Sequence, residues 1–290
     1  MKNVRTTRSI PHAEYFPSPD AQVAPARWLA GVRRDARELA HFWPVVQNMV
    51  TQDLRVRYQR SILGFLWTLI NPILMMATLT MVFSQVFHIK DWKAYAIYLF
   101  AGQVPWAMFG QSLVECSASI VANEGLIRKI YLPKLIFPLA RVLLNLATFV
   151  LSLVALYILA GLLGARLSAP MLLLPVVIGV FAVFTMGLGL ILATANTFYR
   201  DTGHLFTVIL QAWYFATPII WSEADMSPAV QARCWLNPAF PFIKMFQIII
   251  RDGQWPDLTY LLVATCLATV SLGVGYVTFK CHENKLVFRL

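Results

Sequence analysis

Residues 167–199 read LSAPMLLLPVVIGVFAVFTMGLGLILATANTFY and contain no Asp, Glu, Lys or Arg. A helix needs about 20 predominantly apolar residues to cross the roughly 30 Å hydrocarbon core of a bilayer. This run is long enough to cross, and it is too long for a buried strand. It also lacks the alternation expected of the roughly 10-residue strands of an outer-membrane barrel. The stretch therefore predicts a transmembrane helix.

Five further stretches are mostly apolar and free of charged residues: 61–89, 94–114, 142–165, 202–222 and 258–279. With 167–199 they predict an all-α, polytopic membrane protein with six transmembrane helices. The composition agrees, because 58% of the 290 residues are hydrophobic and only 13% are charged, against about 25% charged in a soluble domain. It argues against a soluble cytoplasmic enzyme and against a disordered chain.

The basic residues predict the orientation, because cytoplasmic loops of membrane proteins are rich in Lys and Arg. With the N-terminus inside, 18 of the 24 Lys and Arg residues are cytoplasmic: ten up to Arg60, four in 128–141, Arg200 and three after residue 279. An even number of spans then places both termini in the cytoplasm. Topology accounts for the net charge of +10, and no nucleic-acid partner is expected.

The chain divides into four regions. Residues 1–26, with four prolines, are expected to form a flexible cytoplasmic arm. Residues 27–60 have apolar positions at helical spacing and a basic opposite face, which predicts an amphipathic interfacial helix that Pro44 kinks or splits. A helix packed on a cytoplasmic partner would show the same pattern. Residues 61–280 form the transmembrane domain, and 281–290 form a cytoplasmic tail.

The last outer loop, residues 222–257, is long and apolar. It contains two short helical pieces, 228–236 and 239–250, separated by Asn237-Pro238, a turn signal. Apolar pieces of this length cannot span, so short re-entrant helices that form an outer gate are one interpretation. The alternative is a helical cap at the membrane interface, anchored by an aromatic belt. The residues of that belt would be Trp221, Trp235 and Trp255.

The inner connection between the second and third spans, residues 122–138, predicts a short charged helix. Asn123 is placed to cap it, Glu124 faces Arg128 at i,i+4, and Pro133 ends it. Such a helix is suited to contact with a cytoplasmic subunit, whereas a solvated turn is the alternative.

Ionisable residues are rare in the predicted spans. Glu115 and Arg141 are the clearest, and we expect them to snorkel or to pair with each other. No Walker A motif, HExxH, paired-Cys metal pattern or GxSxG is present, so no nucleotide, metal or catalytic site is expected in the chain. Four glycines are expected to allow close helix packing. They are Gly102, Gly110, Gly187 and Gly189.

Several short motifs occur in a fixed order along the chain. They are DLRVRY at 53–58, SILGFLW at 61–67, NP at 71–72, NEGLIRKIYLP at 123–133, YRD at 199–201, TPIIW at 217–221 and LNP at 236–238. Over residues 45 to 280 this order resembles the ABC-2 type permeases of the polysaccharide export family. The first 26 residues lie outside the resemblance.

The resemblance implies the transmembrane subunit of an ATP-driven exporter of O-antigen, capsular or teichoic-acid-type polymers. These polymers are carried on a polyprenyl diphosphate lipid. It further implies a homodimer, bound to two copies of a separately encoded ABC ATPase, in the bacterial inner membrane. The chain would hold no cofactor, since ATP and Mg²⁺ would belong to the partner subunit. It would be a transport permease and not an enzyme.

The resemblance and the residue patterns together suggest four groups of site residues. ATPase coupling is assigned to Asn123, Glu124, Leu126, Ile127, Arg128, Lys129, Tyr199, Arg200 and Asp201. Binding of the lipid diphosphate at the substrate entry is assigned to Arg55, Arg57 and Arg60. The candidate aromatic residues of the channel are Trp67, Tyr98, Trp106, Phe109, Trp213 and Tyr214. The outer gate is assigned to Pro218, Trp221, Trp235, Asn237 and Pro238.

Two other functions fit the same composition. An ABC-2 exporter of lipids or drugs would share the fold. A membrane glycosyl- or acyltransferase would need a pair of catalytic acids or an interfacial His, and no such pair stands out in the sequence.

Overall fold

The computed structural model describes residues 25–59, 63, 66–162 and 168–289, and all regular secondary structure in these residues is helical. The chain forms two compact units, residues 1–41 and 42–290. Residues 1–24 of the predicted arm lie outside the described residues. The described part of the first unit is helix α1, Pro25–His41.

The second unit begins with α2, Trp43–Tyr58, which carries Pro44 in its first turn. Proline is tolerated there because the N–H groups in the first turn of a helix have no acceptor within the helix, so the N–H that proline lacks is not missed. The predicted amphipathic segment is therefore split into two helices, as the position of Pro44 indicates. Its location at the membrane surface stays a prediction.

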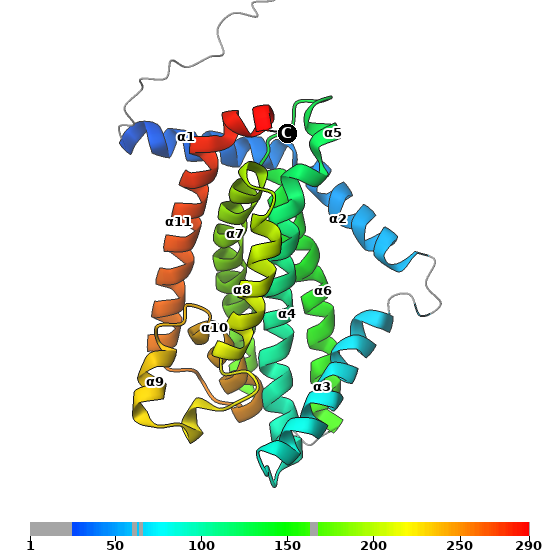
Figure 1. Cartoon of the computed structure of the whole chain (residues 1–290), viewed down its shortest axis with the longest axis vertical. Helices are drawn as coiled ribbons and strands as arrows, with labels where there is room; N and C mark the ends of the chain where they lie inside the picture. The colour runs from blue at the N-terminus through cyan, green and yellow to red at the C-terminus, as the bar shows by residue number, and fades with distance from the viewer. Residues whose placement is uncertain (1–24, 60–62, 64–65, 163–167, 290) are drawn as a thin grey trace, which may run out of the picture. The chain divides into compact units, whose positions relative to one another are not determined.

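Each of the six predicted spans coincides with a helix of the second unit (Figure 1). These are α3 (Trp67–Val86), α4 (Trp92–Ala122), α6 (Ile136–Leu162), α7 (Leu174–Phe198), α8 (Thr202–Ala216) and α11 (Leu258–Arg289). A 3-10 turn, η2 (Ala169–Leu173), precedes α7.

Among the described residues, three stretches are long and apolar enough to cross a membrane: Ile136–Ile158, Ala169–Phe198 and Leu258–Leu286. Residues Ile70–Val86 form a shorter apolar helix, and α8 has only 15 residues. A polytopic membrane protein is therefore confirmed, while the number of six spans stays a prediction. Helix α11 continues to Arg289, so the described residues of the predicted tail are helical, and their cytoplasmic location stays a prediction.

Helix α4 lies at the centre of the second unit and packs against α3, α6, α7, α8 and α10 (Phe240–Gln247). The ring of Phe109 on α4 is fully buried, and it stacks on Phe181 and Phe184 of α7 at centroid distances of 5.5 and 5.7 Å. The ring of Trp213 on α8 meets Phe109 edge-on at 5.4 Å. Such aromatic contacts fix the positions of neighbouring helices.

Helices α7 and α11 approach so closely that their backbones touch. A Cβ atom added to Gly275 would lie 2.1 Å from the carbonyl oxygen of Gly187, and one added to Gly187 would lie 2.3 Å from the carbonyl carbon of Ser271. The Ser271 hydroxyl donates to the carbonyl oxygen of Phe184 at 3.0 Å across the same contact. The predicted role of Gly187 in close packing is confirmed.

The other three predicted glycines also lie against neighbouring helices. A Cβ atom added to Gly102 would lie 2.9 Å from the side chain of Gln247. One added to Gly110 would lie 2.8 Å from Leu210, and one added to Gly189 would lie 2.9 Å from Cys116.

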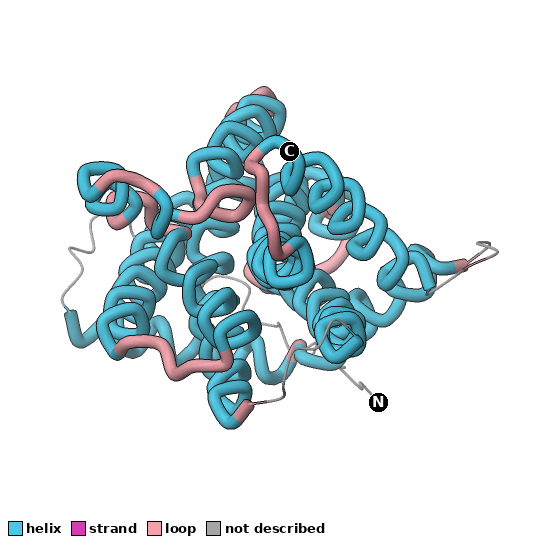
Figure 2. The backbone as a smooth tube through the Cα atoms, turned by 90° about the horizontal axis from the view of Figure 1, so that it is seen from below, coloured by secondary structure: helices cyan, strands magenta, loops and turns pink. Residues whose placement is uncertain are grey.

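The short helices lie toward opposite ends of the second unit. Helix α5 (Glu124–Ile127) lies at the same end as the C-terminus, and α9 (Pro228–Cys234) lies at the end of the α3–α4 turn (Figure 1). Helix α10 continues into a π-helical turn, Ile248–Asp252. Figure 2 shows the helices from below, with the connecting loops and turns in pink. Helices thus form within both predicted pieces of the outer loop, and their re-entrant placement stays a prediction.

Candidate functional site

A cleft of about 500 Å³ lies between α3, α4 and α6. Its apolar wall includes Trp67, whose side chain is 48% exposed, together with Met75 and Phe149. Its polar lining comes from Arg57, Asn71, Gln103, Gln111, Asn145, Thr148 and Ser152. Polar side chains that face a cavity between apolar helices usually mark a functional site.

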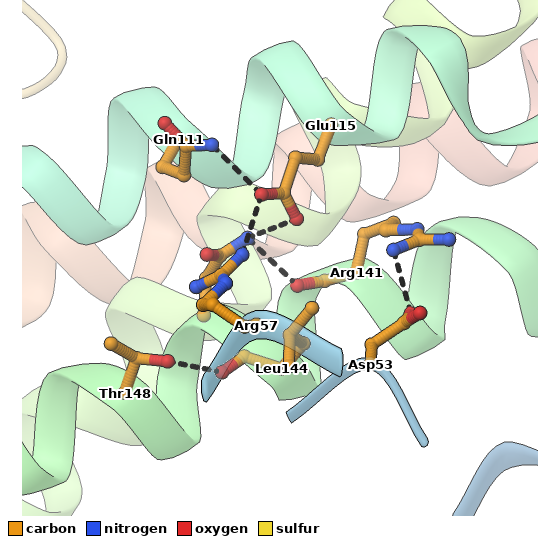
Figure 3. Close-up of polar contacts among 8 residues, drawn as sticks. Asp53, Arg57, Gln111, Glu115, Arg141, Leu144 and Thr148 are labelled. Atoms are coloured by element: carbon orange, nitrogen blue, oxygen red, sulfur yellow. Dashed lines mark hydrogen bonds and ion pairs between the residues drawn. The ribbon is translucent and has the colours of Figure 1, made fainter. Parts of the chain in front are cut away.

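Three donors from this lining converge on the carboxylate of Glu115 on α4. Arg57 donates to Glu115 Oε1 at 2.9 Å, and Gln111 Nε2 donates to the same oxygen at 2.8 Å (Figure 3). Asn145 Nδ2 donates to Glu115 Oε2 at 2.9 Å. The Glu115 side chain is 17% exposed. A carboxylate so far removed from water is stable only when it is paired and hydrogen-bonded, and this arrangement satisfies both oxygens.

A second ion pair lies beside the first, where Arg141 of α6 donates to Asp53 of α2 at 2.7 Å (Figure 3). The expected mutual pair of Glu115 and Arg141 is therefore wrong, because each of them bonds to α2. Asp53 and Arg57 are four residues apart and share one face of that helix. This docking role was not predicted from the sequence. The available signals were the opposite charges of Asp53 and Arg57 at i,i+4 and the single charges Glu115 and Arg141 in two predicted spans.

The three arginines assigned to the lipid diphosphate have different surroundings. Arg55 is exposed, with no ion pair among the described residues. Arg57 is 33% exposed and is held by Glu115. Arg60 lies outside the described residues. The assignment to a diphosphate stays a prediction for all three.

Of the six aromatic candidates, Trp67 is the one that lines the cleft. Tyr98, Trp106 and Phe109 are buried. Trp106 packs on Phe109, Trp213 and Tyr214 at centroid distances of 5.5 to 5.9 Å. These rings form the packed interior of α4 and α8 in this structure, and their role in a channel stays a prediction.

A short helix, α5, forms in the first inner connection, but it ends at Ile127 and not at Pro133, and Asn123 does not cap it. No side-chain cap bond is present at Asn123, whose Nδ2 instead donates to the carbonyl oxygen of Ser119 at 2.8 Å and so binds the end of α4. The predicted pair of Glu124 and Arg128 is confirmed at 2.8 Å. Leu126, Arg128 and Lys129 are exposed and Ile127 is half-buried.

The second inner connection also presents its predicted residues to the surface, since Tyr199, Arg200 and Asp201 are all exposed. Asn196, which the sequence analysis missed, holds this connection in place. Its Nδ2 donates to the carbonyl oxygen of Ser117 on α4 at 2.9 Å, and its Oδ1 accepts from the N–H of Gly203 on α8 at 2.9 Å. An amide within the apolar run 167–199 was the available signal.

Residues 217–220 of the outer turn are buried and Trp221 is half-buried. Tyrosines of α4 satisfy carbonyl groups of this turn. The Tyr95 hydroxyl donates to the oxygen of Ile220 at 2.7 Å. The Tyr98 hydroxyl lies within hydrogen-bond distance of two carbonyl oxygens, that of Trp221 at 2.8 Å and that of Pro218 at 3.1 Å, and donates a bifurcated hydrogen bond to them. Non-helical backbone is tolerated at membrane depth only when the protein satisfies it in this way.

Asn237 connects the outer turn to the loop before α10. Its Oδ1 accepts from Trp213 Nε1 at 2.7 Å and from the N–H of Ala239 at 3.0 Å, while its Nδ2 donates to the Thr217 hydroxyl at 2.9 Å. The structure thus brings Pro218, Trp221 and Asn237 into one assembly, with Pro238 next in the chain. Trp235 lies elsewhere, stacked on Tyr260 at 5.0 Å.

The helical membrane fold and the polar cleft are those of a transport protein, and comparison with known families agrees. The ABC-2 type transporter family model matches residues 44–250. The chain belongs to this family.

Several curated relatives match nearly their full length. The O-antigen export system permease protein RfbA of Myxococcus xanthus is 31% identical over 87% of this chain and 97% of the relative. The protein of the same name from Klebsiella pneumoniae is 26% identical over 87% of this chain and 95% of the relative. The polysialic acid transport protein KpsM of Escherichia coli is 19% identical over 83% of this chain and 95% of the relative.

Proposed function

We propose that this chain is the transmembrane permease of an ATP-driven exporter that moves a lipid-linked polysaccharide, such as an O-antigen, across the bacterial inner membrane. The observation that carries the proposal is the match to a relative named as an O-antigen export permease, because it extends over 97% of that relative. The polar cleft between otherwise apolar helices supports it, since a hydrated ligand needs hydrogen-bonding groups within the membrane.

The energy would come from two copies of an ABC ATPase, which bind the ATP and Mg²⁺. The chain carries no Walker A motif. The proposed docking surface consists of the two inner connections, with exposed Leu126, Arg128 and Lys129 on one and Tyr199, Arg200 and Asp201 on the other. Apolar and charged side chains exposed side by side suit a protein partner.

Two permease chains would form a homodimer that encloses the path of the polymer, with both termini in the cytoplasm. The polyprenyl diphosphate would bind near Arg55, Arg57 and Arg60, since guanidinium groups pair with phosphates in bidentate fashion. Exposed Arg55 is available for this contact, whereas Arg57 would have to leave Glu115.

The docking surface can be tested by co-purification with an ABC ATPase encoded beside the permease gene. A triple charge reversal, Glu124→Lys with Arg128→Glu and Lys129→Glu, is expected to abolish co-purification while the permease stays folded. The matched control reverses Lys280 and Glu283, a part-buried i,i+3 ion pair near the end of α11 and outside both inner connections. Wild-type assembly of the triple variant would exclude α5 as the docking element. Unchanged surface polysaccharide after deletion of the permease gene would exclude the proposed function.

A further inference from the structure

Glu115 determines which atoms of the Gln111 and Asn145 amides face the cleft between α3, α4 and α6. A carboxylate accepts hydrogen bonds and does not donate them, so the NH₂ groups of Gln111 and Asn145 must face Glu115. Their carbonyl oxygens are then left for the cleft that both residues line. Neither oxygen has a hydrogen-bond partner among the described residues.

Gln103 also lies on α4 and lines the cleft, but its amide is oriented the other way, with its NH₂ group left for the cleft. The Tyr214 hydroxyl donates to Gln103 Oε1 at 2.5 Å, which leaves the NH₂ group of Gln103 as a donor for the cleft. Gln103 and Gln111 are eight residues apart on one helix, a rise of about 12 Å. These three amides therefore offer the cleft two acceptors near Arg57 and one donor farther along.

This arrangement suits a sugar better than it suits a phosphate alone. A phosphate oxygen only accepts hydrogen bonds, so the carbonyl oxygens of Gln111 and Asn145 would repel it. A sugar hydroxyl both donates and accepts, and the apolar face of a sugar ring can lie on the exposed ring of Trp67. The volume of about 500 Å³ falls within the range of small-molecule sites, roughly 300–1,000 Å³.

We propose that the cleft between α3, α4 and α6 binds the first one or two sugar rings of the lipid-linked saccharide, next to its diphosphate. This proposal rests on the proposed function, because it takes the ligand to be a lipid-linked polymer. Gln111 and Asn145 accept hydrogen bonds from the hydroxyls of the ring nearest Arg57, and Gln103 donates to a hydroxyl farther from the phosphate. Glu115 is a positioning residue, since it acts through the two amides.

The test measures binding to the full-length permease in lipid nanodiscs. Three probes are compared: undecaprenyl diphosphate bearing one N-acetylglucosamine, sugar-free undecaprenyl diphosphate, and phosphatidylglycerol. The wild-type protein is expected to bind the sugar-bearing lipid about ten-fold more tightly than the sugar-free lipid, on the scale of one or two net hydrogen bonds. Phosphatidylglycerol is expected to compete weakly.

Two variants separate the role of the amides from that of the phosphate contact. Gln111→Leu removes one acceptor, and Glu115→Gln removes the group that orients both amides. Each is expected to reduce the ten-fold preference to about two-fold or less, with no loss of affinity for the sugar-free lipid. Gln85→Leu, which replaces an exposed amide of α3 outside the cleft, is expected to keep the wild-type preference. A monodisperse elution profile and unchanged helical content verify the fold of each variant, since loss of the Arg57–Glu115 pair is itself expected to lower the melting temperature of Glu115→Gln.

The outcomes distinguish this proposal from the one on which it rests. If the wild type shows no preference for the sugar-bearing lipid, or if both variants keep it, the cleft does not bind sugar, whereas export of a lipid-linked polymer still stands. Equal competition by phosphatidylglycerol would make the cleft a phospholipid headgroup site and overturn the proposal. If neither undecaprenyl lipid binds, the lipid-linked substrate of the proposed function fails as well.

Discussion

The guanidinium of Arg57 lies 2.9 Å from the carboxylate of Glu115, so that α2, the helix before the first predicted span, is bonded to the middle helix of the fold. The neighbouring pair of Asp53 and Arg141 bonds α2 to α6 in the same way. Four charges in an otherwise apolar region thus neutralise one another in two pairs. The two ion pairs thus fix the position of α2, the helix before the first predicted span, against α4 and α6.

Removal of Glu115 is expected to loosen α2. Glu115→Ala leaves Arg57, Gln111 and Asn145 without their acceptor. Because the Arg57 side chain is 33% exposed, the expected cost is that of donors left without a partner, about 1–3 kcal/mol. Amide hydrogen exchange over residues 43–58 should accelerate, and the melting temperature should fall. The control is Glu124→Ala, which removes an exposed i,i+4 pair expected to contribute about 0.5 kcal/mol or less. Equal effects of the two substitutions would contradict the docking role of Glu115.

The contact of α7 with α11 is expected to reject any side chain at Gly187. Gly187→Ala would place a Cβ 2.3 Å from the backbone of Ser271, so the two helices must move apart. Overpacking of this kind costs about 1–3 kcal/mol and should lower both the melting temperature and the yield of folded protein. Gly179→Ala, in the same helix with nothing within 4 Å of the added atom, should be neutral or slightly stabilising. A neutral Gly187→Ala would show that the helices do not meet at this point.

Two tyrosines allow a matched test of the outer turn. Tyr98→Phe removes the hydroxyl that donates to the part-buried carbonyl of Trp221, and leaving that carbonyl unsatisfied is expected to cost about 1 kcal/mol, the lower end of the range for buried groups. The Tyr157 hydroxyl is buried with no hydrogen-bond partner among the described residues, so Tyr157→Phe should be neutral or stabilising. Thermal unfolding in one detergent compares the two variants. The role of Tyr98 is disproved if Tyr157→Phe is the more destabilising of the two.

Much of the fold could be predicted from the sequence because the bilayer imposes simple rules. A long charge-free run without alternation, such as residues 167–199, is expected to form a helix in lipid, because a helix satisfies its backbone groups within one segment. Pro44 and the short charged helix after Asn123 were also visible from local chemistry. Local rules failed where a side chain had two possible partners. Asn123 was expected to cap α5, and it binds the end of α4 instead.

The partners of Glu115 could not be predicted because they come from α2, α4 and α6, and local patterns contain no information on which helices become neighbours. The same limitation applies to the rings of Trp106 and Phe109. Their aromatic character favours a packing role over a channel wall without fixing their neighbours, which come from α7 and α8. Positions defined by contact with lipid were thus more predictable than positions defined by contact between helices.

Transport by the reconstituted complex tests the proposed function most directly. The permease and its ATPase are placed in inverted proteoliposomes, and the lipid-linked polysaccharide protected inside them is measured with and without ATP. We predict ATP-dependent accumulation that is lost when the α5 charge-reversal variant replaces the wild type. Equal protection of the polymer with and without ATP, in vesicles whose ATPase is active, would contradict a role of this chain in polysaccharide export.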